Sequence, residues 1–432
     1  MTRRFASFRA LLVAVYQLTR VDAADPISLT LTEAREAAWR NHPRISVAEL
    51  KALAARQVVR ETQAGFLPNL SANFVAVGTA SDNTRLGALG SLNNPSIFDR
   101  TAGGLMLSQL ITDFGRTANL SGSAKLRAQA ENDNVQATRA QIYLQVEAAF
   151  YASLQAQAVI HVAEQTVTTR QLFLDQVTAL AGNQLRSELD VSFARVNLDE
   201  GRLLMSRAQN DLQASQSQLA TLMGLREPGN YQFVEEPAPM AVTTNVSVFI
   251  ARALESRPDL LRLRHERDAA QRFARGEKAA HYPTLSAVGS AGVLPVHDNR
   301  LADNYAAAGV ILNVPLFAGN LYSARQQEAE LRARAVAESL RDEENNVIRD
   351  VRIAWLNTQN AADRLQITAQ LRENSRLAFK LAEARYRSGE SSFVELNRAQ
   401  LNEISAEITH TTTKYEFLLQ HAVLDFQTGQ LP

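Results

Sequence analysis

Two Ser-x-x-acid pairs are the residues of this chain whose types and spacing best suit local chemistry. They are Ser187-x-x-Asp190 and Ser392-x-x-Glu395. A serine followed three residues later by an acid can form a capping box, in which hydroxyl and carboxylate each accept a bond from a backbone amide at a helix start. Gly389, just before the second pair, can adopt the positive φ that ends a helix. Helix capping therefore explains both pairs, and each predicts a tight turn between two helices.

Motifs of enzymes are missing from the sequence. The seven histidines are scattered, and there is no His-Glu-x-x-His, no Gly-x-Ser-x-Gly and no phosphate-binding glycine loop. Asp113-Phe114-Gly115 spells the metal-binding tripeptide of kinases, but the other kinase elements are lacking, so it is better read as a strand-to-helix turn. We therefore predict a protein that is not an enzyme, with no catalytic, cofactor-binding or metal-binding residues.

Charge and cysteine content narrow the class further. Lys and Arg number 45 and Asp and Glu also 45, so no excess charge favours nucleic acid as a partner. The chain has no cysteine, which excludes disulfides, thiolate metal sites and a lipid-modified N-terminal cysteine.

Residues 1–23 have the pattern of a signal peptide. Three arginines precede an apolar run at 10–16, and Val21-Asp22-Ala23 offers a small-residue cleavage site. The alternative is the start of an amphipathic helix. No later run approaches the ~20 apolar residues of a transmembrane helix. We expect an exported protein without a helical membrane anchor.

The capping pairs are expected to join very long helices. Residues 116–180 contain no proline and one glycine, so they predict one helix of about 100 Å at roughly 1.5 Å per residue. Its inward positions step by threes and fours, a spacing typical of coiled coils. These positions are Ile142, Val146, Ala149, Ser153, Ala156, Ile160, Ala163 and Val167.

The second half of the chain repeats the first. A shift of 215 takes Pro43 to Pro258 and Pro68 to Pro283, and a shift of 205 takes Val146 to Val351, Ser187 to Ser392 and Asp190 to Glu395. We predict two repeats, 24–224 and 246–432, joined by a linker at 225–245 that is rich in proline and acid. Each repeat should contain helix, strand, strand, very long helix and medium helix, in a fold that is mainly α with a small β part.

The four predicted strands are close to the 9–11 residues of a tilted transmembrane strand. In a membrane only a closed barrel satisfies all backbone groups, and the smallest such barrels have eight strands. Four strands would therefore have to be pooled with those of other copies. The alternative is a small soluble β-layer. The expected lipid-facing strand residues are Leu105, Leu107, Ile111, Val310, Leu312, Val314 and Leu316.

Segments from both halves resemble the TolC family of outer-membrane efflux and secretion channels. They are LTEAREAAWRNHPRI and FLPNLSANF in the first half, and ARALESRPDLL, HYPTLSAVGSAG, NVPLFAGN and YRSGESSFVELNRAQ in the second. The resemblance covers the chain from about Leu29 to Gly429. Because the chain has no cysteine, it resembles the branch of this family whose members lack a lipidated N-terminus.

The resemblance implies a homotrimer in the outer membrane of a Gram-negative bacterium. Each chain would give four strands to a 12-stranded transmembrane β-barrel, continuous with a periplasmic barrel of twelve helices. The function implied is the exit duct of a tripartite efflux pump or type I secretion system. This passive conduit would be opened by a periplasmic membrane-fusion adaptor and served by an inner-membrane transporter of the ABC, RND or MFS class. The alternative, a soluble periplasmic coiled-coil adaptor or structural protein, gives no reason for the strand pairs.

The resemblance also assigns the helix turns to the periplasmic tip of the channel. Adaptor docking falls on Ser187, Gly389 and Ser392, and the pore gate on Tyr386, Glu395 and Asp190. In a trimer each acid becomes a ring of three carboxylates, and such rings select cations.

Two departures from the family pattern lie near this tip. Arg398 replaces a second acid and could pair with Glu395, and the arginine that often follows the glycine is absent, with Glu390 and Ser391 in that region.

Overall fold

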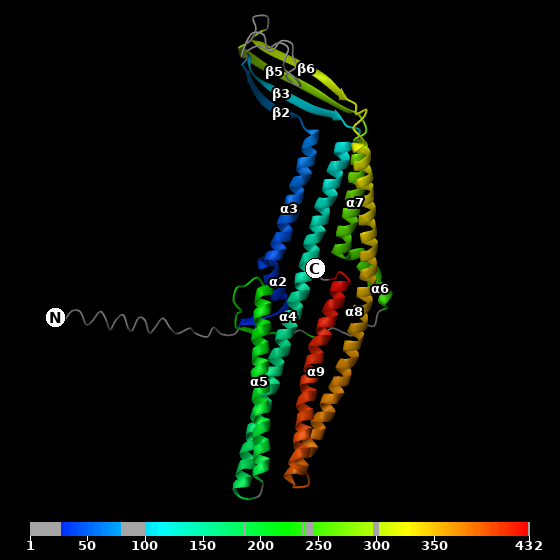
Figure 1. The fold of residues 1–432 in the computed structure, drawn as a ribbon. Coiled ribbons are helices and arrows are strands. Elements are labelled where there is room, and N and C mark those ends of the chain that lie inside the picture. The colour runs from blue at the N-terminus through cyan, green and yellow to red at the C-terminus, as the bar shows by residue number, and fades with distance from the viewer. Residues whose placement is uncertain are drawn as a thin grey trace, which may run out of the picture. The chain divides into compact units, whose positions relative to one another are not determined.

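The computed structural model describes residues 27–78, 100–184, 187–235, 237, 245–296 and 302–430. The elements of the first half are β1 (Ile27–Leu29), α2 (Leu31–Asn41), α3 (Pro43–Gln63), a 3₁₀ turn (Ala64–Phe66), β2 (Asn69–Val77), β3 (Arg100–Thr112), α4 (Arg116–Gly182) and α5 (Glu188–Leu222). Those of the second are β4 (Tyr231–Phe233), α6 (Val246–Ser256), α7 (Pro258–Ala279), β5 (Thr284–Val296), β6 (Asn304–Asn313), α8 (Leu321–Arg387) and α9 (Phe393–Gln427) (Figure 1). The predicted signal peptide, 1–23, lies outside the described residues.

The order of elements repeats from one half to the other. The very long helices α4 and α8 both have 67 residues, and the medium helices α5 and α9 both have 35. The fold is mainly helical with a small β part, as predicted. None of the helices in the described ranges combines the length and apolar character needed to cross a membrane.

The chain forms two compact units that cut across the repeats. The described residues of unit 1 fall within 27–46, 138–256 and 347–430, and those of unit 2 within 47–137 and 257–346. Each unit draws on both halves because α4 and α8 contribute residues to both.

Unit 1 is built from two helical hairpins, α4 with α5 and α8 with α9, whose turns lie at the same end (Figure 1). Its core is centred on the fully buried Phe150 and includes Ile142, Val146 and Leu219. Along the predicted α4 stripe, Ala149, Ser153, Ala156 and Ala163 are also buried, while Ile160 and Val167 are partly buried. Small residues therefore line this inward face, which allows close helix packing. Strands β1 and β4, which sequence reasoning missed, pair in parallel.

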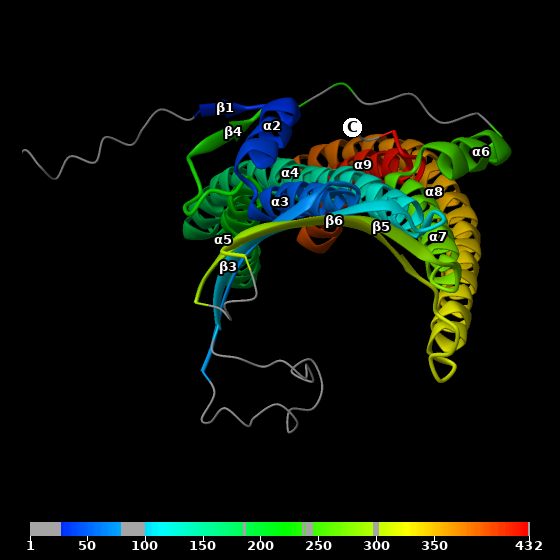
Figure 2. The same cartoon turned by 90° about the horizontal axis from the view of Figure 1, so that it is seen from above.

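Unit 2 carries an antiparallel sheet of order β2-β3-β5-β6, placed at the ends of α3, α4, α7 and α8. Figure 2 shows the sheet as a curved band. Cross-strand partners lie on the same face of a sheet, so the pairing sorts its side chains. One face, called here the apolar face, carries Leu70, Ala72, Phe74, Leu105, Leu107, Leu285, Val293, Ala308, Val310 and Leu312. The opposite face carries Ser71, Asn73, Met106, Ser108, Ser286, Ser290, Tyr305, Ala307 and Ile311.

Three of the seven predicted lipid-facing residues have a different local setting from the one expected. Strand β6 ends at Asn313, so Val314 and Leu316 follow the strand instead of belonging to it. Pro315, which has no amide hydrogen to donate to a ladder, explains this end. Ile111 lies at an irregularity of the β3–β5 ladder, between the paired residues Leu110 and Thr112. All seven side chains are exposed in the single chain.

Candidate functional site

The turn between α4 and α5 is fixed by the predicted capping box. The Ser187 hydroxyl accepts a hydrogen bond from the Asp190 amide at 3.2 Å, and the Asp190 carboxylate accepts one from the Ser187 amide at 3.3 Å. In the described part of this turn Gln184 has a positive φ of 59°, whereas Gly182 is the last residue of α4.

The turn between α8 and α9 has only half of its predicted capping box. Gly389 has the expected positive φ of 81°, and the Ser392 hydroxyl accepts from the Glu395 amide at 3.3 Å. The Glu395 carboxylate instead accepts from the Arg385 guanidinium of α8 at 2.8 Å, in an ion pair whose two side chains are about half exposed. In the described structure the cation paired with Glu395 is Arg385, which reaches across the turn from α8, and not Arg398, the partner that the sequence suggested.

Tyr386, the predicted aromatic gate residue, lies inside unit 1. Its side chain is 6% exposed, and its ring centroid is 5.8 Å from Phe173 of α4 and 6.4 Å from Phe393 of α9. Phe393 also stacks on Phe173 at 5.5 Å and on Phe193 of α5 at 6.0 Å. This aromatic cluster ties the two hairpins together just inside their turns. The gate role of Tyr386 stays a prediction.

A groove continues from the cluster along unit 1. A cavity of about 330 Å³ is lined by Leu172, Phe173, Leu180, Phe379, Tyr386 and Leu396, with Glu383 and Arg387 among its polar groups. The next cavity, of about 460 Å³, is lined by Arg372, Arg376, Glu403 and Glu407. Burial raises the pKa of Glu403, while Arg376 opposes this shift.

A buried arginine, which sequence reasoning missed, joins α4 to α5. Arg170 donates to the carbonyl of Asn197 and lies 3.6 Å from Glu200. Burial lowers its pKa. The side-chain amide of Asn197 in turn donates to the side-chain oxygen of Asn397 of α9 at 2.8 Å, so these hydrogen bonds connect the two hairpins. Gly201 of α5 leaves room for this side chain, because a Cβ there would meet the Arg170 side chain at 3.4 Å, but the sequence spacing alone does not mark this contact.

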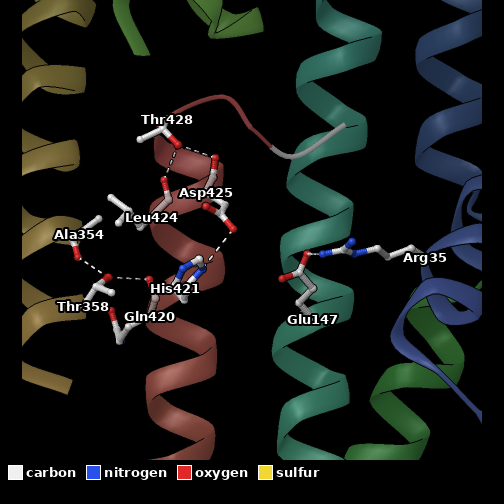
Figure 3. Close-up of polar contacts among 9 residues, drawn as sticks. All are labelled: Arg35, Glu147, Ala354, Thr358, Gln420, His421, Leu424, Asp425 and Thr428. Atoms are coloured by element: carbon white, nitrogen blue, oxygen red, sulfur yellow. Dashed lines mark hydrogen bonds and ion pairs between the residues drawn. The ribbon is translucent and has the colours of Figure 1, made fainter. Parts of the chain in front are cut away.

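A second polar group lies farther along unit 1, away from the turns (Figure 3). The fully buried Glu147 of α4 pairs with Arg35 of α2. The Thr358 hydroxyl donates to the Gln420 carbonyl at 3.0 Å and so joins α8 to α9. His421 lies 3.3 Å from Asp425, and its hydrogen bond to this carboxylate raises the pKa of the imidazole. The first two contacts join neighbouring helices, whereas the His421–Asp425 contact lies within α9.

Paired hairpins with capped turns and a four-stranded sheet also make up the fold of solved outer-membrane channels. A sequence model of the family "Outer membrane efflux protein" matches residues 34–225 and 249–430, so the chain belongs to this family. It is 24% identical to the alkaline protease secretion protein AprF of Pseudomonas aeruginosa, over 94% of this chain and 86% of the relative. It is also 24% identical to the solvent efflux pump outer membrane protein SrpC of Pseudomonas putida, over 86% and 79%. The crystal structure of VceC from Vibrio cholerae shares the fold, with a TM-score of 0.79, 18% identity and coverage of 92% and 96%.

Family membership decides the broad function. The protein is the outer-membrane exit channel of an efflux or secretion system in a Gram-negative bacterium. Members of the family are channel proteins. The alternative of a soluble periplasmic adaptor is therefore set aside.

Proposed function

We propose that three copies of the chain form one channel, with a 12-stranded transmembrane β-barrel and a periplasmic barrel of twelve helices. The single observation that carries this proposal is the sheet of unit 2, which ends in the strands β2 and β6 and exposes an apolar face. Such a sheet in water invites aggregation at its edges. Pairing β6 of one copy with β2 of the next closes a barrel and satisfies both edges.

The apolar face is the proposed lipid-contacting surface. It contains four of the expected residues, Leu105, Leu107, Val310 and Leu312, and the pairing adds Leu70, Phe74, Leu285 and Val293 from the other two strands. The other three expected residues, Ile111, Val314 and Leu316, flank this face. Outer-membrane strands alternate in this way between a lipid side and a lumen side.

The helical turns of unit 1 are the proposed periplasmic tip. In this proposal a periplasmic adaptor contacts Ser187, Gly389 and Ser392, and the gate is formed by Tyr386, Glu395 and Asp190. An inner-membrane transporter of the ABC, RND or MFS class supplies the energy. The names of the relatives, one for protease secretion and one for solvent efflux, support both a type I secretion system and a tripartite efflux pump.

The repeats 24–224 and 246–432, with the linker 225–245 between them, are the proposed evolutionary units. The family match falls into two segments, 34–225 and 249–430, which supports these boundaries.

Fractionation followed by planar-bilayer recording tests the assembly. We expect a heat-modifiable trimer in the outer-membrane fraction that gives discrete conductance steps. A monomer that gives no conductance after purification from that fraction would overturn the proposal.

A further inference from the structure

Two glycines lie side by side on the face of the sheet opposite to the apolar face. Gly104 of β3 pairs with Gly292 of β5, and Asn73 of β2 and Tyr305 of β6 complete the row across the sheet. Cross-strand partners share one face, so the Tyr305 side chain lies on the same face as these glycines. The strands approach closely here, because a Cβ at Gly104 would lie 2.8 Å from the carbonyl oxygen of Ala291.

The far end of the Tyr305 side chain fills the space that both glycines leave. A Cβ at Gly292 would lie 2.7 Å from Cζ of the Tyr305 ring, and a Cβ at Gly104 would overlap the Tyr305 hydroxyl oxygen. Contacts this close do not occur with a real Cβ, so glycine is required beneath the ring at both positions. The side chain therefore lies down across β5, with its hydroxyl over β3, instead of projecting away from the sheet.

The apolar face shows that a glycine can be covered with less constraint. Phe74 and Tyr305 are the aromatic residues of the strands β2, β3, β5 and β6. Phe74 lies over one glycine, Gly103, where a Cβ would be 3.6 Å from the ring, an ordinary contact. Aromatic cover of a glycine strengthens a sheet, but this purpose does not require a side chain that spans two further strands.

One side of the Tyr305 ring remains open above the sheet. The side chain is 38% exposed although the two glycines lie beneath it. The next row of the same face carries Met106, which is 45% exposed, together with Ser71, Ser290 and Ala307. An aromatic ring and a thioether therefore lie close together among small, uncharged side chains.

We propose that Tyr305 is a stacking site for planar aromatic cargo on the lumen wall of the channel. Aromatic rings attract one another in offset-stacked arrangements, and a positive charge on the ligand adds attraction to the face of a tyrosine. The Met106 thioether, one row away, suits contact with the edge of an aromatic ligand. This inference rests on the proposed function, which places this face of the sheet toward the lumen.

A role of Tyr305 in packing alone is the rival interpretation, and two substitutions distinguish it from stacking. Tyr305→Leu keeps an apolar side chain over the glycines but removes the aromatic face. Tyr305→Phe keeps both the packing and the aromatic face. Phe74→Leu is the matched control, because it removes the aromatic residue of the opposite face from the neighbouring row, where Phe74 pairs with Gly103.

Ethidium, a planar aromatic cation, is the probe. Each full-length protein is reconstituted in phosphatidylcholine nanodiscs, and ethidium binding is measured by fluorescence anisotropy against empty nanodiscs. We expect Tyr305→Leu to weaken binding at least about threefold, and Tyr305→Phe and Phe74→Leu to change it by less than about twofold. The heat-modifiable band on gels and the conductance in planar bilayers show whether each protein forms the channel.

Three results would overturn the stacking site and leave the channel intact. They are conducting Tyr305→Leu protein with unchanged ethidium affinity, an equal loss of affinity in Tyr305→Phe, and an equal loss in Phe74→Leu. The last result would place the probe on the lipid side. Unmodified protein that forms neither trimer nor conductance would instead overturn the proposed function as well.

Photolabelling of the unmodified channel with azidoethidium tests the site without any substitution, and so covers the case in which Tyr305→Leu does not fold. Peptide mapping by mass spectrometry should find the label in β6, residues 304–313, or in β3, residues 100–112. Label confined to other parts of the chain would overturn the inference.

Discussion

Arginine substitutions at two adjacent alanines of β6 give the sharpest test of the apolar face. Ala308 pairs with Gly289 on this face, and Ala307 pairs with Ser290 on the opposite one. Both alanines are exposed in the single chain, and both lie in the middle of the strand Asn304–Asn313. Ala308→Arg and Ala307→Arg therefore introduce the same side chain at nearly the same depth, on different faces.

The expected difference follows from the depth of Ala308. A ten-residue strand at about 3.3 Å per residue, tilted by about 40°, spans roughly the ~25 Å apolar band of a membrane barrel, so its middle lies near the bilayer centre. Arginine on the lipid face costs about 2–4 kcal/mol there. At ~1.4 kcal/mol per tenfold, Ala308→Arg should lower the inserted fraction roughly 30- to 700-fold relative to Ala307→Arg.

Urea titration of folding into lipid vesicles measures this difference, with the heat-modifiable band on gels as a second readout. Both variants change the same edge strand, so general damage to β6 affects them alike. Equal losses, or a larger loss for Ala307→Arg, would refute the assignment of the two faces.

Three further predictions concern unit 1. Gly389→Ala should lower the free energy of unfolding by about 1–2 kcal/mol because φ is positive at this position. Gly182→Ala, at a helical position, should be neutral or stabilising. Equal effects of the two substitutions in thermal unfolding would contradict this prediction. The raised pKa of His421 means that its bond to Asp425 stabilises the fold fully below about pH 6.5 and is lost as pH rises through the folded pKa. The free energy of unfolding, measured from pH 6 to pH 8, should show this loss. An Asp425→Asn variant whose free energy of unfolding changes with pH as that of the unmodified protein does would refute the prediction. Tyr386→Ala should lower the free energy of unfolding, measured by calorimetry, by about 3–5 kcal/mol, since its ring joins both hairpins. A loss under about 1 kcal/mol would show that the aromatic cluster contributes little to stability.

The order of elements was predictable because prolines, glycines and the internal repeat mark element ends directly in the sequence. Strands β1 and β4 were not, because three residues each are too short to show a period. The apolar face was found in β3 and β6, where Leu and Val alternate. In β2 and β5 small residues hide the alternation, and only cross-strand pairing reveals it.

At the tip, one capping box was predictable in full and the other in half, and the long-range contacts were not. Ser187 and Asp190 form their box because both partners lie within four residues. Tyr386 packs against Phe173 of the other hairpin, and Arg170 packs against a glycine of the next helix. Neither partner is marked by sequence spacing alone.

The two turns of the tip differ at a position of the very long helix from which a side chain can reach the tip acid. A shift of 205 takes Leu180 to Arg385, and in the described residues of the two turns the ion pair to a tip acid is the one from Arg385 to Glu395. Asp190 keeps its capping bonds, and no ion pair to it is found in the described part of the chain. A ring of three Asp190 carboxylates should therefore attract cations more than one of Glu395. We expect Asp190→Asn to lower the cation-to-anion permeability ratio in planar bilayers about twofold or more, and Glu395→Gln to change it less. The reverse order would show that Arg385 leaves Glu395 when three copies assemble, and would move the cation-selective ring to the second turn.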